Sequence, residues 1–235
     1  MTSDPWLRDW NYQLMVGLFR LIPHSRTTDG IADLLVLTPL LSTWIVALYF
    51  YRYWTKDDGH RASRRRYLLN AVMAFAMAAI ISIVIRPWVH WPAPVLNPSF
   101  QALFPRDLWG SGSKNCFPSH STLAYFTMAA GFWPLHRGLS IVLSTLALLF
   151  VSLPRVYAGG HYPIDVIFSC VLGFLMLIAV WRWPVPVRVA NWLVGTEAKS
   201  NLQDWLFFLW TFELGEGFRS AEVLAGIARR LSHWP

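Results

Sequence analysis

Residues 67–85 form a run of nineteen residues without a charged side chain. A helix needs about 20 apolar residues to cross the hydrocarbon core of a bilayer, so this run has the length of a transmembrane helix. The rest of the chain agrees, since 55% of its 235 residues are hydrophobic and only 14% are charged. Its fourteen tryptophans are typical of side chains at membrane–water interfaces. The sequence therefore predicts an integral membrane protein and excludes an ordinary soluble domain.

Four further apolar segments predict an all-α fold, a polytopic membrane helix bundle with about five transmembrane helices. They are residues 31–51, with a kink expected at Pro39, and residues 118–135, 139–153 and 162–183. Because each is bounded by polar or basic residues, we expect each to be a separate span.

Both ends of the chain are predicted to lie outside the spans. Residues 6–22 are amphipathic but too short and too charged to cross, which indicates an interfacial helix. Residues 202–212 are apolar but also too short, so we expect a second interfacial or packing helix there. The predicted domains are an interfacial N-terminal segment (1–30), a transmembrane catalytic domain (31–183) and a cytoplasmic or interfacial tail (184–235).

The basic loop at residues 52–66 predicts the orientation. By the positive-inside rule it lies in the cytoplasm, so the span at 67–85 runs outward and delivers Arg86 to the other face. We expect a multi-pass protein of the cytoplasmic (inner) membrane whose active site faces the periplasm or the cell exterior. The two cysteines, Cys116 in a loop and Cys170 in an apolar run, are expected to stay unpaired.

Three polar side chains gather where the last predicted span begins: Arg155, His161 and Asp165. His161 and Asp165 are four residues apart, so on a helix they share a face and the carboxylate can orient the imidazole ring. An oriented imidazole is a nucleophile, and the guanidinium of Arg155 offers a planar fork for phosphate oxygens. The spacing therefore indicates phosphoryl transfer through a phosphohistidine. A His–Asp pair that only caps the helix would have the same pattern.

Two more polar clusters end predicted spans on the same face. One is Arg86, and the other is Ser119, His120 and Ser121. Hydroxyls and free backbone N–H groups at a helix N-terminus form an anion site, and the His120 imidazole can protonate a leaving group. A snorkelling arginine and an ordinary N-cap are the alternative interpretations. Ionisable groups that meet from different helices at one membrane face favour a functional site.

Together these residues resemble the three motifs of the type 2 phosphatidic acid phosphatase (PAP2) superfamily, which are Lys-x6-Arg-Pro, Pro-Ser-Gly-His and Ser-Arg-x5-His-x3-Asp. The resemblance covers about residues 30–183. Arg155, His161 and Asp165 match the third motif, with Pro154 where the family has serine. The resemblance implies that His161 is the catalytic nucleophile, Asp165 its orienting partner and Arg155 a phosphate ligand. It also implies that the protein needs no metal and no other cofactor.

The first motif departs from the family pattern in either possible register. If Arg86 stands for the lysine, Ala93-Pro94 stands where Arg-Pro is expected. If Arg86-Pro87 is the Arg-Pro pair, Ala79 replaces the lysine. One phosphate-binding cation is missing in both cases. Lys114, four residues before Pro118, is a candidate to supply it, although a solvated loop lysine would look the same.

The second motif is one residue short, because Pro118-Ser119-His120 lacks the glycine. The family's histidine position therefore falls on Ser121, and one residue is about 100° of helix rotation. Either the loop adjusts so that His120 still protonates the leaving group, or the site works without that acid. The second option predicts weak hydrolysis and a preference for good leaving groups.

The sequence thus predicts a membrane-embedded lipid phosphatase that dephosphorylates a polyprenyl or phosphatidyl phosphate or diphosphate at the extracytoplasmic face. A phosphotransferase between lipids would use the same residues. A catalytically degenerate lipid-binding or scaffold protein of an envelope-polysaccharide pathway is the alternative from another class; a site without catalysis would have little reason to keep a costly buried His–Asp pair. The expected partners are the lipid phosphate and membrane lipids. Nucleic acid is excluded because the basic residues lie in separate short loops.

Overall fold

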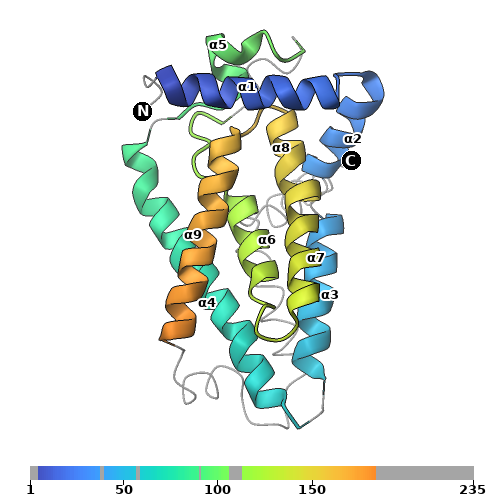
Figure 1. Ribbon diagram of the computed structural model, residues 1–235, viewed down its shortest axis with the longest axis vertical. Helices are drawn as coiled ribbons and strands as arrows, with labels where there is room; N and C mark the ends of the chain where they lie inside the picture. Colours follow the sequence, from blue (N-terminus) through green and yellow to red (C-terminus); the bar gives the residue numbers. More distant parts are fainter. Residues whose placement is uncertain (1–4, 38–39, 57–58, 90, 106–112, 184–235) are drawn as a thin grey trace, which may run out of the picture.

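The computed structural model describes residues 5–37, 40–56, 59–89, 91–105 and 113–183. Within these ranges every regular element is helical and no strand occurs, as the all-α prediction required. The helices are α1 (Pro5–Leu21), α2 (Arg26–Leu37), α3 (Leu40–Thr55), α4 (Arg61–Ile85), α5 (Pro98–Gln101), α6 (His120–Ala130), α7 (Arg137–Ala147), α8 (Leu153–Tyr157) and α9 (Pro163–Arg182), with the 3-10 turns η1 (Arg86–Trp88) and η2 (Pro94–Leu96) and the π-helical segment η4 (Leu148–Ser152). The longer helices run side by side, and α1 crosses one end of the bundle (Figure 1).

Among the described residues, three stretches are long and apolar enough to cross a membrane, namely Ser63–Trp88, Arg137–Tyr157 and Pro163–Arg182. They coincide with three of the five predicted spans, so five transmembrane helices are not confirmed. The predicted span at 118–135 contains the 11-residue helix α6, whose length of about 17 Å is too short to cross alone. The predicted span at 31–51 falls on α2 and α3, which have 12 and 16 residues. The expected kink at Pro39 and the tail at 184–235 lie outside the described residues.

Helix α4 begins at Arg61, six residues before the predicted span. Arg64, Arg65 and Arg66, which were expected in a loop, are therefore on this helix, and Arg64 and Arg65 are buried. Arg64 Nε donates to Tyr53 O at 3.0 Å and Arg65 Nε donates to Trp54 O at 3.2 Å. These carbonyls lie in the last turn of α3, where they have no partner within the helix. The two arginines, near the start of α4, thus cap the C-terminal end of α3.

The second candidate span continues past the end predicted from the sequence at residue 153. Helices α7 and α8 are joined through the π-helical η4, so Pro154 and Arg155 lie on the helix and not after it. Proline lacks the backbone N–H that an α-helix needs, and a wider turn before it accommodates that loss. Arg155 therefore lies in the last turn of the continuous helical segment formed by α7, η4 and α8.

Helices α4, α6, α7 and α9 form the core of the bundle. Two glycines allow the close approach to α6. A Cβ at Gly173 of α9 would collide with Thr127, and one at Gly131, just after α6, would collide with Ala71 of α4. Small residues at helix interfaces are typical of membrane bundles because they let backbones pack closely. Helix α6 is therefore surrounded by other helices.

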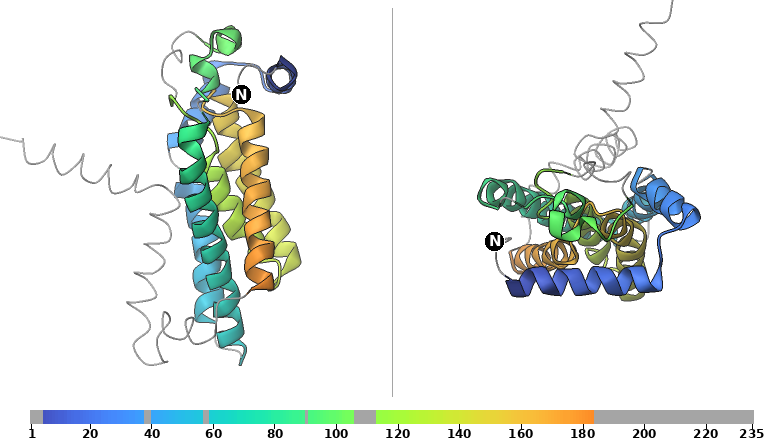
Figure 2. Two further views of the ribbon diagram at one scale, coloured as in Figure 1. Left: turned by 90° about the vertical axis from the view of Figure 1, so that its left-hand side faces the viewer. Right: turned by 90° about the horizontal axis from the view of Figure 1, so that it is seen from above.

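Helix α1 packs on α8 and α9, as the contacts and the view from above agree (Figure 2). Its buried Asn11 joins it to the bundle: Asn11 Oδ1 accepts a hydrogen bond from Ile164 N at 3.2 Å. That N–H belongs to the first turn of α9, where it has no partner within the helix. The helix expected at residues 6–22 is confirmed, and it covers the end of the bundle where α9 begins.

Candidate active site

His161 and Asp165 meet at the start of α9. His161 precedes the helix, because Tyr162 is the N-cap residue and Pro163 occupies the first turn, where proline is favoured. The expectation that His161 lies on the helix is therefore wrong. Asp165 reaches back instead, and its Oδ2 lies 3.5 Å from His161 Nδ1. This separation is long for a hydrogen bond, as is common in a catalytic pair without its substrate.

The turn that presents His161 is closed by the backbone of Arg155. Its carbonyl accepts hydrogen bonds from Gly160 N at 2.9 Å and from His161 N at 3.3 Å. Gly159 has φ +71°, a left-handed conformation that a side chain disfavours. A Cβ there would also collide with Val95 and Phe104. Glycine is required at this position, immediately before the site.

Gly159→Ala should destabilise the protein by about 2–4 kcal/mol, since it combines left-handed backbone strain with overpacking. The measurement is thermal unfolding of the detergent-solubilised protein. Gly17→Ala is the matched control, because nothing lies within 4 Å of a Cβ added there on α1. The control should be neutral or slightly stabilising. Equal melting temperatures for the two variants would contradict the assignment.

Asp165 is fully buried and is held by two groups besides His161. Its Oδ2 accepts hydrogen bonds from Tyr162 N at 2.9 Å and from Cys116 Sγ at 3.2 Å. Burial and the neighbouring carboxylate raise the pKa of the Cys116 thiol, so the thiol is protonated and donates. The sequence predicted only that Cys116 lies in a loop. The Asp165 carboxylate is thus fixed by its own segment, through Tyr162, and by the loop before α6, through Cys116.

His120 begins α6 and lies among the same group of side chains. Its Nε2 lies 3.2 Å from Ser82 Oγ, on α4. His120 is outside the three candidate spans, and its pKa is lowered to about 4 by burial and by the positive charges of Arg86 and His161. Histidine 120 is therefore neutral at pH 7 in the ligand-free protein, and all three predicted clusters are within electrostatic reach of one another.

The two predicted phosphate-binding arginines differ in their contacts. Arg155 is buried, and its Nη1 donates to Val151 O at 2.8 Å. Arg86 is half-buried, and its Nε has no hydrogen-bond partner among the described residues. Its backbone is fixed, because Asn115 Nδ2 donates to Arg86 O at 2.9 Å. Arg86 is therefore the cation that is ready to bind an anion.

The remaining predicted residues are placed less directly. Ser119 is the N-cap of α6, yet its hydroxyl contacts Thr122 Oγ1 at 3.0 Å and makes no side-chain cap. Ser121 is half-buried in the first turn, and the side chain of Lys114 is exposed. The backbone of the neighbouring Ser113 does approach the first motif, since its carbonyl accepts Ala93 N at 3.0 Å. Lys114 thus comes directly after a residue that contacts Ala93, the position that lacks an arginine in one register of the first motif.

Cys116, His161 and Asp165 offer three ligand atoms within 4.8 Å of one another, which is close enough for a metal ion. A thiol must lose its proton to bind a metal, and the raised pKa of Cys116 opposes that loss. In the protein as described, Cys116 and Asp165 of this set are joined by the hydrogen bond from the thiol to the carboxylate. Both cysteines are free thiols.

Comparisons with known proteins identify a family. The family model of the PAP2 superfamily matches residues 67–188. The bacitracin transport permease protein BcrC of Bacillus licheniformis is 26% identical over 144 residues, which are 61% of this chain and 66% of that relative, just under two thirds of its length. No solved structure matches the chain. The matched region contains His120, His161 and Asp165 and covers more than half of the chain, which therefore belongs to the PAP2 superfamily.

Proposed function

We propose that this membrane protein is a lipid phosphatase that releases phosphate from a polyprenyl or phosphatidyl phosphate or diphosphate. The family supports a phosphoric ester hydrolase, and the observation that carries the proposal is His161 Nδ1 at 3.5 Å from the buried Asp165. Arg86, whose Nε has no hydrogen-bond partner among the described residues, acts electrostatically on the same His120 as His161 does. Such a set can orient a nucleophile and bind a phosphate dianion at the same place. The substrate is an amphiphile because the site lies at the end of a membrane bundle.

The proposed reaction has two steps. His161 attacks phosphorus in line, so that an N–P bond forms while the bond to the lipid oxygen breaks and His120 gives that oxygen a proton. Water then attacks the phosphohistidine, the N–P bond breaks, and inorganic phosphate leaves. A lipid acceptor in place of water would make the protein a phosphotransferase, which labelled acceptor lipids would detect. No metal takes part in either step.

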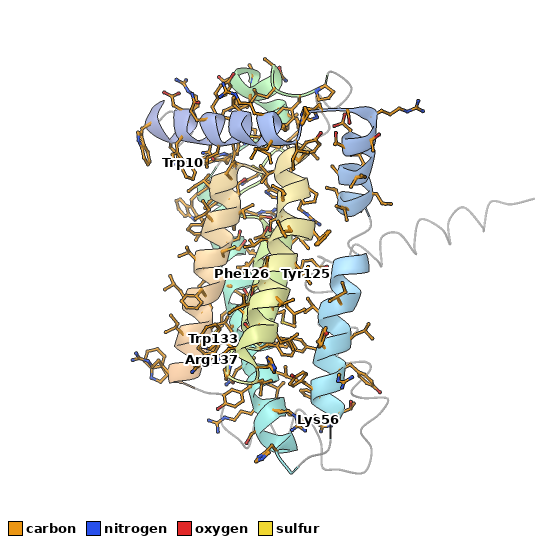
Figure 3. The ribbon with its side chains drawn as sticks, turned by 45° about the vertical axis from the view of Figure 1, so that its right-hand side comes forward. Trp10, Lys56, Tyr125, Phe126, Trp133 and Arg137 are labelled. Carbon is orange, nitrogen blue, oxygen red and sulfur yellow. The ribbon has the colours of Figure 1, made fainter. Side chains whose placement is uncertain are left out.

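We place the site on the extracytoplasmic face of the cytoplasmic membrane. Lys56 and Arg137 lie at the end of the bundle opposite to Trp10 and α1 (Figure 3). Basic residues favour the cytoplasmic side, and the site lies at the α1 end, where α9 begins. A lipid headgroup at the outer interface would reach this end directly.

The test is phosphate release by the detergent-purified protein from prenyl diphosphate, prenyl phosphate and phosphatidic acid. Arg86→Ala should lower kcat/KM for the preferred lipid by about 10- to 100-fold, because a charge-assisted hydrogen bond to phosphate is lost. Arg137→Ala, an exposed arginine at the opposite end, is the control and should change little. Release no greater than background from all three lipids would overturn the proposal and favour a binding or scaffold protein.

A further inference from the structure

Cys116 connects the loop before α6 to the carboxylate of Asp165. The thiol donates to Asp165 Oδ2 at 3.2 Å across 49 residues of sequence, and Cys116 is only 1% exposed. Its backbone is fixed as well, because Cys116 N donates to Trp91 O at 2.8 Å. The thiol therefore has a defined position and cannot turn toward solvent.

The same oxygen of Asp165 accepts two hydrogen bonds and faces His161. Tyr162 N, Cys116 Sγ and His161 Nδ1 lie 2.9, 3.2 and 3.5 Å from Oδ2. A carboxylate oxygen has about two lone pairs, which the backbone N–H and the thiol occupy, so His161 Nδ1 makes no hydrogen bond to it and interacts with the negative charge that remains. A thiol is a weak donor and a hydroxyl is a stronger one. The identity of residue 116 therefore sets how much negative charge remains for His161.

We propose that Cys116 is a positioning residue that tunes the proton affinity and nucleophilicity of His161 through the shared Asp165 oxygen. This inference rests on the proposed role of His161 in phosphoryl transfer. A neutral, weak donor keeps the carboxylate oriented while leaving most of its charge to the imidazole. The thiol also stays protonated at neutral pH because burial and Asp165 raise its pKa, so it is a permanent donor.

Two substitutions at this position should act in opposite directions. Cys116→Ser places a stronger donor on Oδ2, withdraws charge from His161 and should lower the pH at which the ring takes up a proton. Cys116→Ala removes the donor and should raise that pH. The expected shifts are about 0.5 pH units each, the size of a net hydrogen-bond contribution. A residue that only fills space would not produce shifts of opposite sign.

Other charged groups surround His161 and must be unchanged between the variants. They are Asp165 beside it, His120 of α6, Arg86, whose charge acts on the same His120, and Arg155, whose carbonyl accepts a hydrogen bond from His161 N. Neighbouring elements carry Lys114, in the loop before α6, and the Arg8–Asp9 pair of α1. The Tyr162 hydroxyl stays protonated, because burial raises its pKa. All of these groups are common to the wild type and both variants, so a difference between the proteins reports residue 116.

The experiment is a pH titration of the protein labelled with ¹⁵N-histidine, observed by NMR in detergent, with His161→Gln identifying the His161 signals. The acid limb of kcat/KM is followed in parallel and should move with the titration, since the nucleophile must be neutral. Cys170→Ala is the control, because Cys170 lies on α9, as Asp165 does, but makes no hydrogen bond to Asp165 among the described residues.

Opposite shifts for Cys116→Ser and Cys116→Ala, with none for Cys170→Ala, support the proposal. Shifts of the same sign, or none, overturn it. Cys116→Ser nearly preserves the side-chain volume, so it decides the question even if Cys116→Ala does not fold. The titration needs no turnover; a protein without phosphatase activity would therefore refute the proposed function and still test Cys116.

Discussion

Phosphate release should fall by at least about 10³-fold when His161 is replaced by alanine, because the variant has lost the atom that forms the N–P bond. Binding of the phosphate by Arg86 and Arg155 would remain, so the loss should appear mainly in kcat. The measurement is the initial rate of phosphate release from the preferred lipid. In parallel, wild type incubated with ³²P-labelled lipid and quenched in alkali should carry protein-bound label, whereas His161→Ala should not.

His60→Ala is the matched control for this loss. His60 is exposed and precedes α4 without a side-chain cap hydrogen bond. The 25 residues of α4, about 37 Å, separate it from Arg86. The His60→Ala variant should release phosphate at a rate near that of the wild type. A His161→Ala variant that keeps more than a tenth of the rate would show that another group attacks phosphorus, and the phosphohistidine route would be wrong.

The spans could be predicted where the sequence itself carries the signal. Helices α4 and α9 are long apolar runs, and hydropathy alone locates most of each. What surrounds an apolar helix is harder to predict. The segment around α6 is as apolar as a span, yet it forms only 11 helical residues packed between α4, α7 and α9. Hydropathy does not distinguish a helix surrounded by protein from one surrounded by lipid, so the count of five spans was not secure.

The start of α4 shows a second limit. A cluster of arginines indicates a solvated loop when only local composition is considered. Arg64 and Arg65 instead satisfy carbonyls of α3, eleven residues earlier in the chain. That stabilisation depends on two helices packing side by side, and no local pattern in the sequence reports it.

The candidate site shows the same difference between local patterns, which the sequence reports, and long-range contacts, which it does not. His161 and Asp165 could be paired from their spacing because both belong to one local segment. Ser82 and Cys116 were not found, since their contacts with His120 and Asp165 join residues 38 and 49 positions apart. One signal was present for Ser82: it precedes Arg86 by four residues on an otherwise apolar helix, which places both on one face. Cys116 had no comparable signal.

The shortened second motif leads to the other large effect. His120→Ala should lower kcat/KM by about 100-fold for a lipid monophosphate, whose alkoxide leaving group needs a proton. The loss should be below about tenfold for p-nitrophenyl phosphate, because the nitrophenolate leaves without protonation. Both substrates are measured with the same preparation, and its thermal unfolding is compared with that of the wild type, so that a folding defect is recognised separately.

The charge state of His120 gives this prediction its direction. With its pKa lowered to about 4, the free protein holds a neutral ring that cannot donate at pH 7. The causes of that shift are burial and the positive charges of Arg86 and His161, and a bound phosphate dianion opposes both charges. A bound dianion therefore raises the pKa of His120 toward the range in which the ring is a general acid, against the burial that lowers it. Equal losses for the two substrates would instead show that His120 only binds phosphate, and a leaving-group dependence that appears in Ser121→Ala would assign the acid to the position where the family carries its histidine.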